Sequence, residues 1–215
     1  MSSSDFTTGI SVIRIAPIEG LSLRLRPYGN PRTFFPGEIL FQQLEEIRSI
    51  FVIESGLVEL AVVSKLGNTK IITNCYDGVI LGEMGLYQNY INTSQATVIK
   101  KSEINVIPIE VGRREFFKDS ELALLLFKSL ATKLQLTTNQ LGIMMLESIL
   151  SRIAYVLLDY HRSEVQITQE KLAAAVGCSR ITVARHLKTL KERGIIKNKR
   201  GVIIVLNRQA LEELI

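Results

Sequence analysis

Residues 167–196 constrain the fold of this chain more than any other stretch, because they have the pattern of two short helices joined by a tight turn. Thr168 and Ser179 are suitable N-caps for the two helices, and Gly177 suits a turn that needs positive φ. The second helix has apolar residues at spacings of four and three, at Val183, Leu187 and Leu190. This pattern predicts a helix-turn-helix with one buried face on each helix.

The outer face of the second predicted helix is basic, and no acidic residue occurs between Arg180 and Lys191. The residues that follow alternate and then turn at residues 198–201, as in a β-hairpin wing. An ordinary pair of packed helices with a solvated charged face is the simpler alternative. The basic face, the wing and the small Ala173, which allows the helices to cross closely, favour a winged helix whose second helix enters a DNA major groove.

Basic charge is concentrated in this same part of the chain. Residues 162–208 contain 11 Lys or Arg and 3 acidic residues, whereas the rest of the chain contains 15 and 18. This distribution favours phosphate binding by the C-terminal segment, since neutralising phosphates releases condensed counterions. With 215 residues, of which 47% are hydrophobic, the chain is long enough for two small domains.

Residues 32–109 consist of short apolar runs separated by turn residues, which predicts antiparallel strands in a sandwich or barrel. The clearest predicted strands are residues 50–53, 57–63, 70–73 and 104–109. The predicted turns lie at Pro36-Gly37, Ser55-Gly56, Gly67-Asn68 and Asp77-Gly78. Residues up to about 31 are expected to form a loosely packed lead-in.

The spacing becomes helical between residues 119 and 146. A coiled-coil-like seam is predicted at Ala123, Leu126, Leu130, Leu134, Thr137, Leu141 and Met144. Further apolar residues lie outside this seam, so the helix must bury two faces, one against the strands and one against a second subunit. Another helix is predicted at residues 149–158 after a hinge near residues 147–148, and a short one at residues 207–214.

Three segments carry a resemblance to a known family. GCSRITVARHLKTLKERGII, at residues 177–196, resembles the DNA-binding end of the CRP/FNR family of transcriptional regulators. LGEMGLY, at residues 81–87, resembles the effector-domain signature of that family, and SLATKLQLTTNQLG, at residues 129–142, resembles its dimerisation helix. The three segments follow one another in the order and with the spacing of the family.

The resemblance implies an α+β fold in three parts. Residues 1–118 would form an antiparallel β jelly-roll of the cyclic-nucleotide-binding type, residues 119–147 a long dimerisation helix, and residues 148–215 a winged helix-turn-helix. It implies a cytoplasmic homodimer that binds double-stranded DNA at a palindromic site and has RNA polymerase as a partner.

DNA contacts are expected from the start and outer face of the second helix, at Ser179, Arg180, Ile181, Thr182, Arg185 and Lys188. Arg180 is suited to a bidentate contact with guanine, and Arg185 to a second base edge or a phosphate. The remaining polar residues are expected on the DNA backbone. Ile181 stands where the cyclic-AMP receptor group has a glutamate that accepts from cytosine, and an isoleucine can instead pack on a thymine methyl group.

An effector pocket is implied at Gly82, Glu83, Met84, Thr93, Ser94, Thr137 and Thr138. In nucleotide-binding members the glutamate takes the ribose 2′-hydroxyl and an arginine takes the cyclic phosphate, but Thr93 occupies the arginine position here. A buried phosphodiester without a cation loses charge-assisted hydrogen bonds. The sequence therefore predicts a small-molecule effector other than cyclic AMP, or none. Two alternatives stay open: a cyclic-AMP-responsive regulator that uses Glu83 with Thr137 and Thr138, and a Glu83 that serves only local hydrogen bonds.

Other classes of protein fit the sequence less well. Residues 1–118 contain no histidine, which argues against a metal-dependent jelly-roll enzyme. Cys75 and Cys178 form no CxxC pair, so no metal or iron–sulfur framework is indicated, and no catalytic residue, metal or cofactor is expected. No apolar run is long enough to span a bilayer, and the N-terminus does not resemble a signal peptide. A ligand-sensing module that acts on protein partners without DNA is the remaining alternative.

Overall fold

The structure is a computed structural model that describes residues 14–65, 67–86 and 90–215. It divides into two compact units. The N-terminal unit consists of Arg14–Leu66 and Ile72–Gln135, and the described part of the C-terminal unit consists of Gly67–Ile71 and Leu136–Ile215. The predicted α+β class is confirmed, with an antiparallel sheet in the first unit and a helix-turn-helix in the second.

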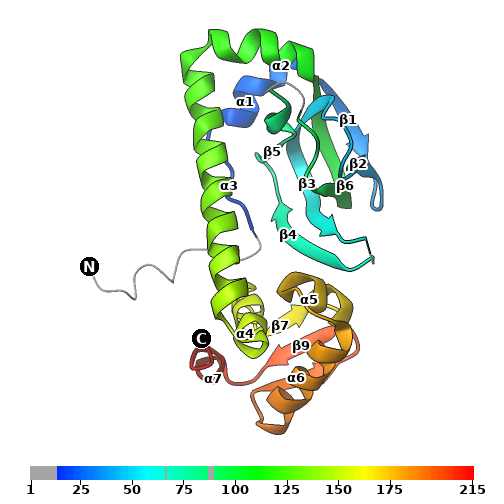
Figure 1. Cartoon of the computed structure of the whole chain (residues 1–215), viewed down its shortest axis with the longest axis vertical. Helices are drawn as coiled ribbons and strands as arrows, with labels where there is room; N and C mark the ends of the chain where they lie inside the picture. Colours follow the sequence, from blue (N-terminus) through cyan, green and yellow to red (C-terminus); the bar gives the residue numbers. More distant parts are fainter. Residues whose placement is uncertain (1–13, 66, 87–89) are drawn as a thin grey trace, which may run out of the picture. The chain divides into compact units, whose positions relative to one another are not determined.

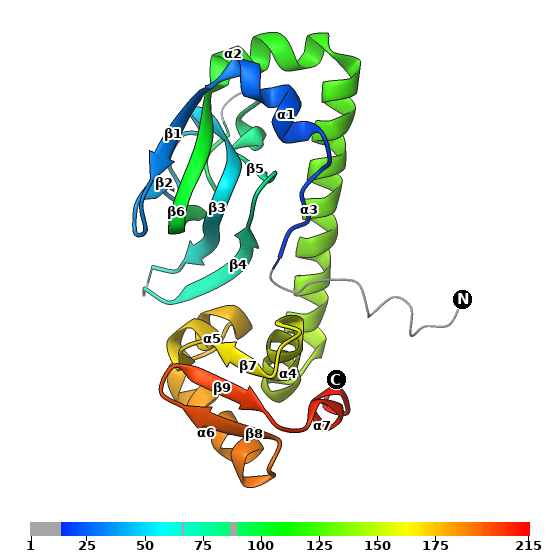
Figure 2. The same cartoon turned by 180° about the vertical axis from the view of Figure 1, so that it is seen from behind.

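Antiparallel strands form the N-terminal sheet, in which the order β1-β6-β3-β4 places the longest two strands at the centre (Figures 1 and 2). β2 also pairs with β6, and β5 with β3. The strands are β1 (Asn30–Phe34), β2 (Ile39–Phe41), β3 (Ser49–Val63), β4 (Thr69–Cys75), β5 (Ile80–Leu81) and β6 (Gln95–Pro108). β6 starts well before the predicted residue 104, and residue 109 already belongs to the next helix.

The predicted turn at Ser55-Gly56 is wrong, because these residues form a bulge within the single strand β3. Gly56 has φ 118°, a value that side chains rarely allow, and an added Cβ would lie 2.1 Å from Ser102 Oγ. The Ser102 hydroxyl accepts a hydrogen bond from Leu57 N and donates one to Lys100 O. A serine from β6 thus stabilises the bulge and lets β3 continue.

Residues 14–31 are more tightly packed than the sequence predicts. Leu21 and Leu25, on α1 (Leu21–Leu25), are buried with Phe116 and Leu122 in the core of the unit. The Arg24 guanidinium forms ion pairs with Asp119 and Glu121 at the start of the long helix. Residues 1–13 lie outside the described residues. The ion pairs of Arg24 join residues 95 and 97 positions apart, so local sequence does not reveal them.

The remaining short helices follow or interrupt the strands. They are η2 (Arg26–Tyr28), η3 (Glu83–Leu86), α2 (Ile109–Glu115) and η4 (Phe116–Lys118). η3 contains the Glu83 of the predicted effector turn.

A single helix, α3 (Ser120–Leu146), spans the predicted helical stretch. The Asp119 carboxylate accepts from Glu121 N and Leu122 N and so caps the start of α3. The predicted seam is partly wrong, because Leu126 is buried in the core of the N-terminal unit. The exposed stripe of α3 lies beside the predicted seam. Its residues alternate at spacings of three and four: Leu124, Phe127, Ala131, Leu134, Thr138, Leu141 and Met145. We call this set the outer stripe.

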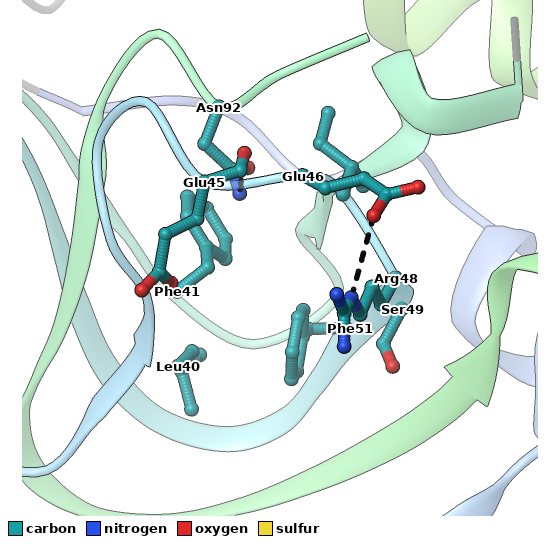
Figure 3. A pocket seen from close by; sticks show the side chains of 9 residues that line it. Leu40, Phe41, Glu45, Glu46, Arg48, Ser49, Phe51 and Asn92 are labelled. Atoms are coloured by element: carbon teal, nitrogen blue, oxygen red, sulfur yellow. Dashed lines mark hydrogen bonds and ion pairs between the residues drawn. The ribbon is translucent and has the colours of Figure 1, made fainter. Parts of the chain in front are cut away.

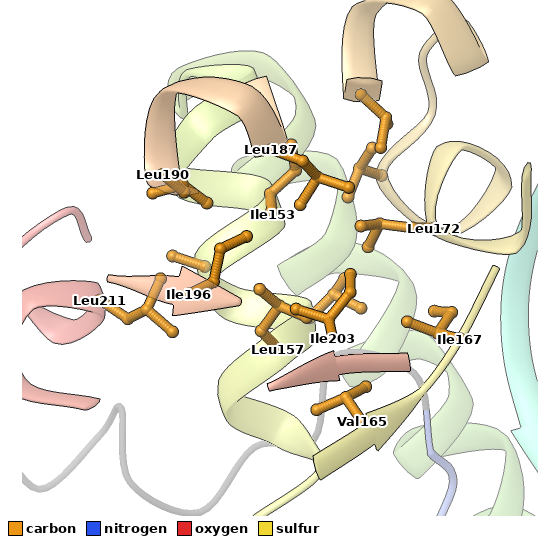
Figure 4. Close-up of a cluster of buried hydrophobic side chains, with 14 of the residues drawn as sticks. Ile153, Leu157, Val165, Ile167, Leu172, Leu187, Leu190, Ile196, Ile203 and Leu211 are labelled. Atoms are coloured by element: carbon orange, nitrogen blue, oxygen red, sulfur yellow. The ribbon is translucent and has the colours of Figure 1, made fainter. Parts of the chain in front are cut away.

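The C-terminal unit has its own hydrophobic core (Figure 4). Its elements are α4 (Ile149–Asp159), β7 (Glu164–Gln166), α5 (Gln169–Val176), α6 (Arg180–Glu192), β8 (Ile196–Lys199), β9 (Val202–Val205) and α7 (Arg208–Glu212). Side chains of α4, of both helices of the helix-turn-helix and of the small sheet meet in this core, including Ile153, Leu172, Leu187 and Ile203. The sheet order β7-β9-β8 adds a strand, β7, that the sequence pattern did not reveal. No helix among the described residues is long and apolar enough to cross a membrane.

Candidate functional site

The helix-turn-helix forms through the local interactions that its sequence predicts. The side chains of Thr168 and Ser179 accept backbone hydrogen bonds from Lys171 N and Thr182 N, and so cap α5 and α6. Gly177 adopts φ 72°, and its N–H bonds back to Ala173 O. Arg152 of α4 donates to the Val176 carbonyl beside this turn. These hydrogen bonds cap both helices and fix the end of α5 to α4.

α6 presents one face to the core and another to solvent. Val183, Leu187 and Leu190 are buried, as predicted. Arg180, Arg185 and Lys188 are exposed, and Ile181 is 83% exposed. Burial, followed by the positive charge of Arg185, lowers the pKa of His186.

Two of the predicted DNA-contact residues interact with each other at the start of α6. The hydroxyls of Ser179 and Thr182 lie 2.9 Å apart, and Ser179 additionally accepts from Thr182 N. Lys188 lies 3.8 Å from Glu192, an exposed pair that contributes little to stability. The structure thus presents all six predicted residues on the first turns and outer side of α6, and their contacts with DNA remain a prediction.

Two glycines, Gly82 and Gly85, allow the close packing of the predicted effector turn at Gly82–Leu86. Gly82 has φ 81°, and an added Cβ would lie 2.4 Å from the Ser49 carbonyl oxygen. Gly85 N bonds to Gly82 O, and an added Cβ on Gly85 would lie 2.5 Å from Ile47. Only glycine fits these two positions without displacing a neighbour.

Two basic residues that the sequence analysis did not identify hold this turn. Arg113, on α2, donates to the Gly85 carbonyl through Nε and Nη2, at 3.1 and 2.8 Å. Lys133, on α3, places Nζ 2.5 Å from Glu83 Oε1 and 2.7 Å from the Ile80 carbonyl oxygen. Glu83 is only 3% exposed and the Lys133 side chain 21%, so this ion pair is largely buried. In the sequence, this ion pair is indicated only by the position of Lys133. It lies seven residues after Leu126, and this spacing places both side chains on the same face of a helix.

The other predicted effector residues are less enclosed. Met84 and Thr93 are exposed, and Ser94 is half-buried. Thr137 and Thr138 are exposed on the part of α3 that belongs to the C-terminal unit, and Thr138 lies on the outer stripe. Their participation in an effector site therefore remains a prediction.

A separate cavity of about 400 Å³ lies in the N-terminal unit (Figure 3). Phe41 and Phe51 contribute its apolar part, while Glu46 and Arg48 form an ion pair of 3.5 Å at its polar part. The Asn92 amide donates to Glu45 O and ties together two loops that line it. None of the seven predicted effector residues lines this cavity.

The cysteines differ in environment. Cys75 is fully buried, and burial raises the pKa of its thiol to about 12; nearby Lys133 lowers this pKa and Glu83 raises it. Burial also raises the pKa of Cys178, with Arg152 acting in the opposite direction. Neither has the lowered pKa of a reactive thiol. Among the described residues, no group of three or more His, Cys, Asp or Glu is placed to hold a metal.

Comparison with known proteins identifies both units. Residues 31–119 match the model of the cyclic nucleotide-binding domain, and residues 151–214 match that of the Crp-like helix-turn-helix domain. The chain is 25% identical to the cAMP-activated global transcriptional regulator Vfr of Pseudomonas aeruginosa, over 75% of this chain and 82% of that protein. It is 26% identical to the cyclic AMP receptor protein of Thermus thermophilus, over 87% and 88%.

Solved structures show the same fold. The c-di-GMP-responsive global regulator CLP of Xanthomonas campestris aligns with a TM-score of 0.79 at 19% identity, covering 86% of this chain and 98% of CLP. A CRP/FNR-family protein of Eubacterium rectale aligns with the same TM-score and identity, over 91% and 94%. The two domain matches, in this order and with this fold, show that the chain belongs to the CRP/FNR family of DNA-binding transcriptional regulators and is not an enzyme.

Proposed function

We propose that this protein is a homodimeric regulator that binds a two-fold symmetric DNA site and does not respond to cyclic AMP. The observation that carries the proposal is the outer face of α6, where Arg180, Ile181 and Arg185 are exposed on a helix whose opposite face is buried. A helix supported in this way can enter a major groove with its first turns against the bases. RNA polymerase is the expected protein partner at a promoter.

Arg180 and Ile181 are proposed to read bases. A guanidinium can bind guanine O6 and N7 with two hydrogen bonds, which contributes about 1–3 kcal/mol of discrimination. Ile181 has no polar atom in its side chain and can only pack on an apolar group, such as the thymine methyl. The proposed half-site therefore contains a guanine opposite Arg180 and lacks the preference that a glutamate at position 181 would impose.

The outer stripe supports the homodimer. Phe127, Leu134 and Met145 are each more than two-thirds exposed, although a soluble helix normally keeps such side chains inside. Spacings of three and four residues along the stripe are those of a two-stranded coiled coil. Two copies of α6 in such a dimer would meet half-sites about 34 Å apart.

The effector proposal rests on Thr93. This residue is exposed and uncharged, so no cation is available at the position where nucleotide-binding members hold the cyclic phosphate. The relatives include cAMP-activated regulators and a c-di-GMP-responsive one, and family membership alone therefore assigns no effector.

Arg180→Ala tests the proposed reading of DNA. We expect affinity for the selected duplex to fall about tenfold, since one bidentate base contact is lost. Arg193→Ala, at the far end of α6, should change affinity much less, because Arg193 lies outside the first turns. Fluorescence anisotropy at several salt concentrations measures both, and wild-type affinity should fall steeply as salt rises. If the wild type shows no salt-dependent DNA binding, the protein acts through protein partners and the proposed function is wrong.

A further inference from the structure

The C-terminal end of α5 is held by basic side chains from two other segments. The last four carbonyls of a helix have no partner within the helix. At this end the carbonyl oxygen of Ala175 accepts from Lys70 Nζ at 2.9 Å, and that of Val176 accepts from Arg152 Nη1, also at 2.9 Å. Both α5 residues are buried, so their carbonyls depend on these donors. Two cations thus stabilise the negative end of the α5 dipole.

Lys70 reaches this end from a distant part of the chain. It lies on β4, 105 positions before Ala175, yet Gly67–Ile71 belongs to the same compact unit as the helix-turn-helix. Burial, followed by the positive charge of Arg152, lowers the pKa of the Lys70 ammonium to about 8. The ammonium therefore gives up favourable hydration to bind the α5 carbonyl, and it is still largely charged at neutral pH.

The stem of Lys70 also packs against the turn of the helix-turn-helix. A Cβ added to Gly177 would lie 3.3 Å from Lys70 Cδ and 3.1 Å from Met144 Cε. The turn glycine is therefore enclosed by Lys70 as well as by α3. The recognition helix α6 begins at Arg180, three residues after this glycine. A shift of the turn consequently moves the residue that is proposed to read guanine.

We propose that Lys70 is a positioning residue for DNA binding, because it holds the end of α5 and the turn that leads into α6. This inference rests on the proposed reading of bases by α6, and it adds a residue that acts without touching DNA. Without the ammonium, the Ala175 carbonyl is left buried and unpaired. The end of α5 then relaxes toward another donor, and the first turn of α6 loses the geometry that base contacts require.

Two substitutions of Lys70 test this role. Lys70→Met keeps an unbranched stem against Gly177 and removes the ammonium, so it should bind the selected duplex about tenfold more weakly than the wild type. Lys70→Arg retains a charged donor and should bind within about twofold of the wild type. Fluorescence anisotropy measures the affinities, after circular dichroism has shown that the variants are folded. If Lys70→Met does not fold, Lys70→Gln also removes the charge and should show the same loss.

Leu211→Ala is the control for a loss of stability alone. Leu211 is buried on α7 in the core of the same unit, so its truncation leaves a cavity and lowers the urea midpoint. This change keeps Lys70 and Gly177, and the folded variant should therefore bind DNA like the wild type. The salt dependence is a further readout. Lys70→Met should keep the wild-type slope, because a positioning residue contacts no phosphate.

Four results would overturn the proposal while the wild type binds DNA. They are wild-type affinity of Lys70→Met, an equal loss of affinity in Lys70→Arg, an equal loss in Leu211→Ala, or a salt slope of Lys70→Met reduced by about one. The last result would place Lys70 on a DNA phosphate. Failure of the wild type itself to bind DNA would instead contradict the proposed function, and this inference with it.

Discussion

Replacing Leu134 by glutamate should convert the protein into a monomer at micromolar concentration and weaken its binding to a two-half-site duplex by about a hundredfold or more. Leu134 lies near the middle of the outer stripe and is 69% exposed in the single chain. In a symmetric dimer each substitution acts twice, so two leucines lose their burial and two carboxylates face an apolar seam. Sedimentation velocity gives the oligomeric state, and anisotropy gives the affinity.

Lys128→Glu is the matched control for this experiment. Lys128 is also exposed on α3 and lies outside the outer stripe, so even the larger change of charge in Lys128→Glu should leave the dimer intact. If Leu134→Glu remains dimeric and binds DNA like the wild type, the outer stripe is not the dimer interface. If both variants dissociate, the effect comes from charge on α3 rather than from the stripe.

The second large effect is expected at Gly82. Gly82→Ala should lower the free energy of unfolding by about 3 kcal/mol or more, since alanine is strained at positive φ and its Cβ would lie 2.4 Å from the backbone oxygen of Ser49. A backbone atom in β3 cannot move aside as the end of a flexible side chain can. Denaturation in urea, with the midpoint and slope compared for the two proteins, measures the loss.

Gly37→Ala separates the two causes. Gly37 also has a positive φ, 93°, but an added Cβ there would meet nothing within 4 Å. This variant should lose only about 1 kcal/mol, the cost of the backbone conformation alone. Equal losses at the two positions would show that the close approach of Gly82 to Ser49 does not matter.

The sequence predicted the C-terminal unit well because its signals are local. The caps Thr168 and Ser179, the turn Gly177 and the inward face of α6 all act within a few residues, and each lies where the pattern indicates. Such interactions depend little on the rest of the chain. The extra strand β7 was missed because its three residues are too short to show a period.

The N-terminal unit was predicted less well because its deciding contacts are distant in sequence. Gly56 looks like a turn residue until Ser102, 46 positions later, is seen to stabilise a bulge. The pair of Glu83 and Lys133 joins residues 50 positions apart. The register of the outer stripe was also ambiguous, because α3 is apolar on two sides and its pattern does not tell which side meets the strands.

Selection from a random DNA pool, with the wild type and Ile181→Glu compared, tests the central claim most directly. The claim is that the first turns of α6 read the bases of a two-fold symmetric site. The wild type should enrich a palindrome with a guanine opposite Arg180, and Ile181→Glu should enrich a different half-site with an added cytosine preference, since a carboxylate can accept from cytosine N4. If both proteins enrich the same half-site, Ile181 does not face the bases, and the proposed placement of α6 in the major groove is wrong.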